Sequence, residues 1–116
     1  MLYTTIKIGD KELKGRLNAR ALVLIEDTLG MNPLNALMAI SQDNLPSVKV
    51  MLAFLHGALQ SYEHGYTLDK TYDLYDAYLE SGGSYASFVE EVFIPLITDG
   101  GLLPKEDEGK NAHKEK

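Results

Sequence analysis

The sequence lacks cysteine and any long apolar run. The missing cysteine excludes disulfide bonds, thiolate zinc sites and cysteine nucleophiles, and it favours a reducing compartment. No apolar stretch approaches the roughly 18 residues that are needed to cross a bilayer, and the first residues lack the basic segment and apolar run of a signal peptide. We therefore expect a cytoplasmic protein that does not bind a membrane.

Positive charge is scarce as well, because 11 lysines and arginines face 17 aspartates and glutamates, for a net charge of -6. This balance opposes a phosphate backbone, since nucleic-acid binding depends on cations that displace counterions. The first 20 residues are nevertheless locally basic, through Lys7, Lys11, Lys14, Arg16 and Arg20. We interpret this polarity as that of a chain that binds proteins and not nucleic acids.

Motifs for catalysis are also missing. No serine lies in G-x-S-x-G or S-x-x-K, and no glycine-rich phosphate loop occurs. Two helical turns separate His56 from Glu63 and His64, so a structural or surface role is favoured over a metal site for these residues. The sequence predicts no enzyme activity, no catalytic residue, no cofactor and no metal ion.

The chain does contain enough apolar material for one core, because its 116 residues are 45% hydrophobic. We predict one globular domain over residues 1–104 and a mobile charged tail over residues 105–116, where no large apolar side chain occurs. Alternation in residues 2–17, with turn chemistry at Gly9 and Asp10, predicts an N-terminal β-hairpin.

Helical spacing dominates the rest of the domain. Caps and apolar periodicity predict helices over about residues 19–29, 33–41, 46–64, 68–81 and 84–98. Pro95 should kink or end the last helix. Helix 68–81 is expected to bury a face formed by Leu68, Tyr72, Tyr75 and Leu79. The predicted class is α+β, mainly α, with the hairpin followed by a bundle of four to five short helices.

Two features of the helical half could carry binding. Four carboxylates fall along one side of helix 68–81, namely Asp69, Asp73, Asp76 and Glu80. A solvated face is the favoured interpretation, a surface for a basic partner comes second, and a metal or catalytic site comes last. The chain also has seven tyrosines and no tryptophan. These rings either fill the edge of the core or, through Tyr66 and Tyr78, form a groove for a partner helix.

The stretch from Arg16 to Leu34, RLNARALVLIEDTLGMNPL, follows the predicted strand pair. It resembles the tail assembly chaperones of long-tailed siphophages and prophages of Gram-positive bacteria. The pattern comprises an arginine early in the first helix, a glutamate within it, a glycine at its end and an Asn-Pro restart. In this sequence these positions are Arg20, Glu26, Gly30, Asn32 and Pro33.

This resemblance implies a protein that binds the long tape measure protein in the host cytoplasm, before and during polymerisation of the tail tube. Such a chaperone shields an apolar helical chain whose exposed stripes would otherwise associate nonspecifically. Many similar proteins have a longer product, made by minus-one frameshifting, whose extension recruits the major tail protein. Gly109, Lys110 and Asn111 can be encoded by a slippery heptamer, so the sequence permits a frameshift near Lys110.

The main alternative is a small phage or bacterial regulator that binds DNA or a transcription protein through the basic N-terminal region. A regulator that binds DNA should show salt-dependent affinity for duplex DNA, whereas the chaperone should co-purify with a tape measure fragment. The sequence leaves the oligomeric state open and is compatible with a homo-oligomer.

Overall fold

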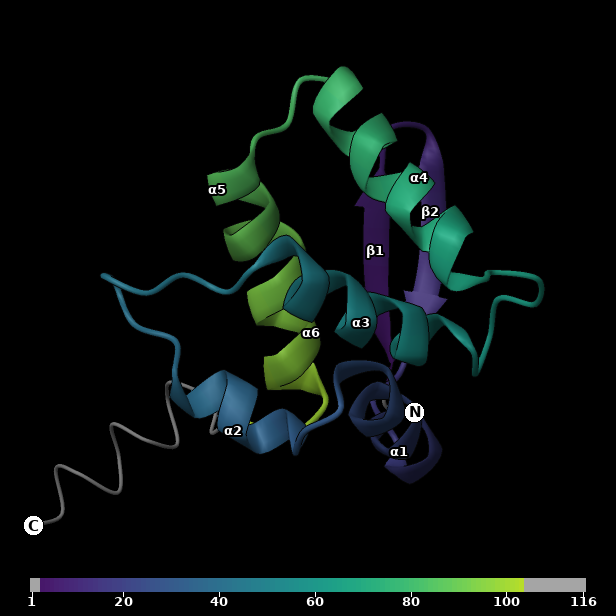
Figure 1. Ribbon diagram of the computed structural model, residues 1–116. Coiled ribbons are helices and arrows are strands. Elements are labelled where there is room, and N and C mark those ends of the chain that lie inside the picture. Colours follow the sequence, from purple (N-terminus) through teal and green to yellow (C-terminus); the bar gives the residue numbers. More distant parts are fainter. Residues whose placement is uncertain (1–2, 104–116) are drawn as a thin grey trace, which may run out of the picture.

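The structure, a computed structural model, describes residues 3–103 (Figure 1). The chain opens with an antiparallel hairpin of β1 (Thr4–Ile8) and β2 (Lys11–Gly15). The helical elements that follow are α1 (Ala19–Leu29), α2 (Pro33–Met38), α3 (Val48–Leu59), α4 (Leu68–Glu80), α5 (Tyr85–Phe88), η1 (Val89–Phe93) and α6 (Ile94–Asp99). Helix covers 56% and strand 12% of the described residues, which confirms an α+β fold that is mainly α. The predicted tail, residues 105–116, lies outside the described residues, and so does the predicted frameshift position near Lys110.

The hairpin turns at Gly9 and Asp10, because Ile8 pairs with the first residue of β2. Gly9 has a φ of 60°, the left-handed geometry that a tight two-residue turn requires at its first central position. Alternate side chains of β1 are buried. The strands are somewhat shorter than the predicted span of residues 2–17.

Polar caps and one glycine set the ends of α1 and the start of α2. Asn18 Oδ1 accepts a hydrogen bond from a first-turn N–H of α1 at 2.9 Å. Gly30, with a φ of 72°, ends this helix in the left-handed conformation. Asn32 then caps α2, and Pro33 follows as its first residue, where a missing N–H costs nothing. The predicted bounds of α1 agree with the structure.

Helix α2 ends at Met38, earlier than the predicted end at Ser41. The side-chain amide of Asn44 donates to the carbonyl oxygen of Ala39 at 2.5 Å. Ser41 and Asn44 also exchange two backbone hydrogen bonds, at 3.0 and 3.1 Å. These bonds close a turn after the helix, so the backbone groups that would continue α2 are used there instead.

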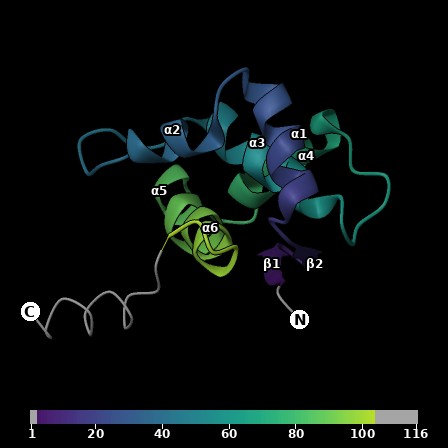
Figure 2. The ribbon, with the colours of Figure 1, turned by 90° about the horizontal axis from the view of Figure 1, so that it is seen from below.

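Helix α3 lies at the centre of the molecule and contacts α1, α4, β2 and η1 (Figure 2). Ser47 caps it by accepting a hydrogen bond from the Val50 N–H at 3.1 Å, so Pro46 precedes the helix and does not open it. Eight of its twelve residues are buried. Buried side chains therefore extend around most of the helix, as in a core helix packed on several sides.

The C-terminal end of α3 differs from the prediction, because the helix stops at Leu59 and not near residue 64. The side-chain amide of Gln60 donates to the carbonyl oxygen of His56 at 2.9 Å and to that of Tyr66 at 2.7 Å. This amide ties the last turn of the helix to the far end of the following loop. Residues 60–67 therefore form a loop that leads into α4.

Two glycines allow the neighbours of α3 to approach it closely. A Cβ at Gly57 would lie 2.7 Å from Cγ1 of Ile25 on α1. A Cβ at Gly15 would lie 3.1 Å from the Cβ of Ala58. Directly after β2, the Arg16 N–H donates to the carbonyl oxygen of Ala58 at 2.9 Å. The hairpin and α1 are thus both fixed against the second half of α3.

The elements α5, η1 and α6 form one continuous helical stretch, which passes through a π-helical turn just before Pro95. Pro95 has no N–H, and in a regular α-helix its ring would clash with the carbonyl group of Glu91. The Ile94 N–H donates to the carbonyl oxygen of Val89, five residues back, and this wider turn makes room for the ring. Pro95 therefore distorts the helix without ending it.

Apart from Ala36, the buried hydrophobic side chains form one cluster, to which both strands and each of the helical elements described contribute. Three phenylalanines, Phe54, Phe88 and Phe93, are among its largest fully buried members. Within residues 3–103, no helix is both long and apolar enough to cross a membrane.

Candidate functional site

Helix α4 carries most of the predicted site residues, but it buries a different face from the one expected. Its buried side chains are Thr71, Leu74 and Tyr78. On the face that was predicted to be buried, Tyr72 is 41% exposed and Leu79 is 39% exposed. Leu68 and Tyr75 of the same face are only partly buried. The predicted inward face is therefore corrected to a half-exposed one.

Tyr78 holds its own face of α4 against the core. Its ring packs edge-on against Phe88, with the ring centroids 5.1 Å apart. Its hydroxyl shares a hydrogen bond with Ser87 Oγ at 2.7 Å and donates to Glu91 Oε1 at 3.1 Å. A Cβ at Gly83 would stand 2.2 Å from a ring carbon of Tyr78. Tyr78 is a core residue, which agrees with the interpretation that the tyrosines fill the edge of the core and is against a partner groove lined by Tyr78.

A groove does lie on this side of the molecule, between α3 and α4. This α3–α4 groove has a volume of about 380 Å³ and is lined by Val48, Lys49, Leu52, Tyr72, Tyr75 and Asp76. Leu52, only 1% exposed, forms its floor. The Tyr75 ring packs edge-on against Phe88, with centroids 5.0 Å apart, and burial raises the pKa of its phenol. One wall of the groove is therefore held in place by the core.

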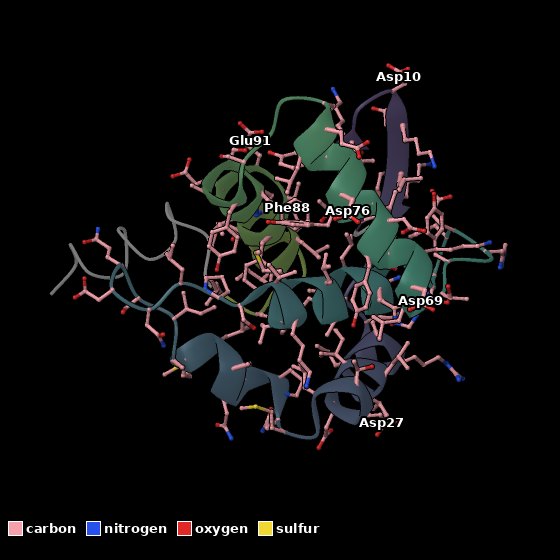
Figure 3. All side chains as sticks on the ribbon, turned by 45° about the horizontal axis from the view of Figure 1, so that its top comes forward. Asp10, Asp27, Asp69, Asp76, Phe88 and Glu91 are labelled. Carbon is pink, nitrogen blue, oxygen red and sulfur yellow. The ribbon has the colours of Figure 1, made fainter. Side chains whose placement is uncertain are left out.

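The four predicted carboxylates are all exposed on the outer side of α4, and we call them the acidic edge: Asp69, Asp73, Asp76 and Glu80. Figure 3 shows Asp69 and Asp76 spaced along the helix. Among residues 3–103, no group of three histidine, aspartate or glutamate side chains is placed to hold a metal ion. The geometry is that of an extended charged rim and not of a convergent site.

Tyr66 and Asp73 line a second cavity, on the other side of α4. It has a volume of about 510 Å³, and Lys11, His64 and Lys70 contribute to its wall. Lys11 comes from the start of β2 and Lys70 from the first turn of α4. The structure thus brings Tyr66 together with one carboxylate of the acidic edge and separates it from the aromatic side chains of the α3–α4 groove.

The three residues weighed as metal ligands are not used together. His56 lies half-buried on α3, where burial lowers the pKa of its imidazole against the opposing effect of a hydrogen bond with the backbone of Tyr66. Glu63 Oε2 accepts a hydrogen bond from the Lys14 N–H at 2.9 Å and so ties the loop to β2. His64 is exposed at the rim of the second cavity. His56, Glu63 and His64 therefore lie in three different surroundings and do not converge on one site.

A second surface, absent from the sequence predictions, lies over α1, α2 and the loop after α2. We call it the α1–α2 surface, and its exposed apolar side chains are Val23, Met31, Leu34, Met38 and Leu45. Val23 and Leu34 line one hollow of about 180 Å³. Met31 and Leu45 line a neighbouring one of about 240 Å³. Met38 is 81% exposed, which is unusual for a side chain of this size and apolar character.

The residues of the family pattern fall on the same part of the fold. Gly30, Asn32 and Pro33 end α1 and start α2, so local backbone geometry accounts for them. Arg20 and Glu26 are exposed on α1, and each lines a shallow hollow that also includes Val23. The pattern therefore marks the helix junction that carries the α1–α2 surface.

Comparison with known proteins gives one match. The profile of a family described as "Family of unknown function (DUF6096)" matches residues 2–115. No curated protein and no solved structure matches the chain.

Proposed function

The chain belongs to the DUF6096 family, whose function is unknown, and we propose that it is a phage tail assembly chaperone. In this role it binds the tape measure protein in the cytoplasm of the bacterial host. It keeps that long helical chain from associating with itself until the tail tube polymerises around it. No chemical step is involved, and the work is done by surface complementarity alone.

The observation that carries the proposal is the position of the exposed apolar side chains. Five of the eleven large hydrophobic side chains that are exposed within residues 3–103 belong to the α1–α2 surface. This region overlaps the stretch from Arg16 to Leu34 that resembles tail assembly chaperones. Exposed apolar side chains gathered on one part of a fold are typical of a binding site, and they suit a client that is itself an apolar helix.

The proposal extends to a longer product of the same gene, made by a frameshift near Lys110, whose extension recruits the major tail protein. Lys110 lies outside the described residues, so the support here is the sequence Gly109-Lys110-Asn111 alone. The nucleotide sequence tests this part. Codons that form no slippery heptamer, with no overlapping downstream frame, would remove the longer product and leave the chaperone role intact.

Co-expression with a fragment of the cognate tape measure protein tests the main role. We expect the two chains to co-elute, and we expect the double variant Leu34→Ser, Met38→Ser to weaken binding by at least about tenfold. Leu34 is 49% exposed and Met38 is 81% exposed. Neither side chain belongs to the core, so the variant should fold. Ile94→Ser, at a 36% exposed position outside the surface, is the matched control.

Two results would overturn this role. One is the absence of co-elution at micromolar concentrations with a correctly folded chain. The other is salt-dependent binding to duplex DNA, lost when the exposed Lys7 and Lys11 are replaced by glutamine, which would favour the regulator instead.

A further inference from the structure

The half-exposed face of α4 forms an apolar stripe that has no partner within residues 3–103 over much of its area. Its members are Leu68, Tyr72, Tyr75 and Leu79, at positions i, i+4, i+7 and i+11 of the helix, and we call them the α4 stripe. The stripe spans about 16 Å at about 1.5 Å per residue, which is three helical turns. Helix α4 therefore carries a second apolar face in addition to the one that packs on the core.

The acidic edge runs directly beside this stripe. With about 3.6 residues per turn, Asp69, Asp76 and Glu80 follow Tyr72 around the helix on the side away from the core. Lys49 is the one cation that lines the α3–α4 groove. A partner that lies along the stripe therefore meets apolar and aromatic groups on one flank of its contact and three carboxylates on the other.

We propose that the α4 stripe and the α3–α4 groove bind an amphipathic helix of another protein, whose apolar stripe is flanked by lysine or arginine residues. The surface goes beyond the tape measure role, because it lies apart from the α1–α2 surface and selects its partner by charge. The apolar stripe of the partner packs on Tyr72, Tyr75 and Leu79. Its basic flank lies over the acidic edge.

The shape of the groove favours a helix as the occupant. Leu52 closes the floor, and Val48 stands at the start of α3, so a side chain projecting from a partner can enter between α3 and α4. Tyr75 is held by its edge-on contact with Phe88 and needs no rearrangement. A partner side chain every three or four residues matches the spacing of the stripe, which is the pattern of helix-in-groove recognition.

Charge decides between the candidate occupants. A nucleic acid is repelled by the acidic edge. The chain's own residues 105–116 contain lysines but no large apolar side chain, so they cannot fill an apolar groove. Within the described residues, each helix carries at most one lysine or arginine, so a second copy offers no helix with a basic flank. A basic amphipathic helix satisfies both the apolar groove and its acidic rim.

A helical peptide of about 18 residues, with leucines at i, i+4, i+7 and i+11 and lysines along one flank, is the probe. Titration into the full chain should give saturable binding with a dissociation constant in the micromolar range, weakened by added salt. A peptide with glutamates in place of the lysines and a scrambled peptide of the same composition should each bind at least about tenfold more weakly.

Variants of the chain locate the site. Tyr72→Ser with Leu79→Ser should weaken the lysine peptide by at least about tenfold, because both side chains are exposed apolar contacts. Asp69→Asn with Asp76→Asn and Glu80→Gln should reduce the salt dependence of binding. Circular dichroism checks that each variant is folded, and Ile94→Ser should bind as the unchanged chain does.

The proposal is overturned if the scrambled peptide binds as well as the ordered one, if no peptide binds, or if the Tyr72 and Leu79 variant keeps full affinity. It is also overturned if sedimentation shows that the unchanged chain self-associates and that this same variant is monomeric, since the face would then serve a second copy. The variant Leu34→Ser, Met38→Ser should leave peptide binding unchanged, so this proposal and the tape measure role can fail independently.

Discussion

His56 is a titratable side chain whose surroundings change on folding. It lies half-buried on α3, and its Nδ1 atom is buried with no hydrogen-bond partner within the described residues. Burial lowers the pKa of the imidazole, and the hydrogen bond with the backbone of Tyr66 only partly offsets this effect. The folded chain therefore holds a neutral imidazole more firmly than the unfolded chain does.

This difference predicts a pH dependence of the free energy of unfolding. Because the pKa of His56 in the folded state lies below its ordinary value of 6.5, the unfolded state takes up the proton first as the pH falls. The contribution of His56 is present in full above that value, and it is lost as the pH falls from there towards the folded-state pKa. Urea denaturation of the unchanged chain and of His56→Gln, at several pH values from 8 to about 5, measures it.

The comparison with His56→Gln is needed because carboxylates and other histidines also titrate over this range. We expect the unchanged chain to lose more stability than His56→Gln does as the pH falls below 6.5. Two parallel curves would show that His56 binds its proton equally well in the folded and the unfolded chain.

At the scale of elements, a single hydroxyl group fixes the start of α4. Thr67 Oγ1 accepts a hydrogen bond from the Lys70 N–H at 3.1 Å, and the carbonyl oxygen of Thr67 accepts one from the buried hydroxyl of Thr71 at 2.9 Å. The side chain of Thr67 thus holds the first turn of α4, and its backbone carbonyl group holds the buried hydroxyl of Thr71. The orientation of the α4 stripe depends on this turn.

Thr67→Ala should lower the free energy of unfolding by about 1 kcal/mol, because a free N–H of the first turn then loses its partner. Thr67→Ser keeps the oxygen and should lose less than half of that amount. Chemical denaturation monitored by circular dichroism gives both values. Equal losses in the two variants would place the effect of Thr67 in its methyl group and not in the cap.

The elements could be predicted where their ends carry local signals, as with Asn18 and Gly30 around α1. The end of α3 could not, because it depends on the Gln60 side chain reaching the carbonyl oxygen of Tyr66 across a loop. The face of α4 was predicted wrongly for a similar reason. Spacing alone counts Thr71 as polar and does not reveal that Gly83 leaves room for the ring of Tyr78.

The candidate site was therefore predictable only in part. The exposed position of the acidic edge follows from its spacing along one helix. The α3–α4 groove depends on which side of α4 packs against α3, and no local sequence signal predicts that side. The α1–α2 surface was missed because Leu34 and Met38 lie on a helix of six residues, too short for its apolar periodicity to separate a buried side from an exposed one.

At the scale of the whole molecule, two kinds of apolar side chain have to be distinguished, those that hold the fold and those that await a partner. Leu55 lies on central α3 and is 1% exposed, whereas Leu34 lies on peripheral α2 and is 49% exposed. Small domains have a net stability of only about 5 to 15 kcal/mol, so one buried charge is enough to unfold them. An exposed site tolerates the same charge.

The same substitution at the two leucines separates these roles. Leu55→Asp should abolish cooperative unfolding, because an unpaired carboxylate in the core costs several kcal/mol in addition to the cavity that the lost leucine leaves. Leu34→Asp should change the free energy of unfolding by less than about 1 kcal/mol while weakening binding of the tape measure fragment. Thermal denaturation and co-elution measure the two effects. A Leu34→Asp chain that unfolds would assign the α1–α2 surface to the core, and the apolar side chains there would then need no client to explain them.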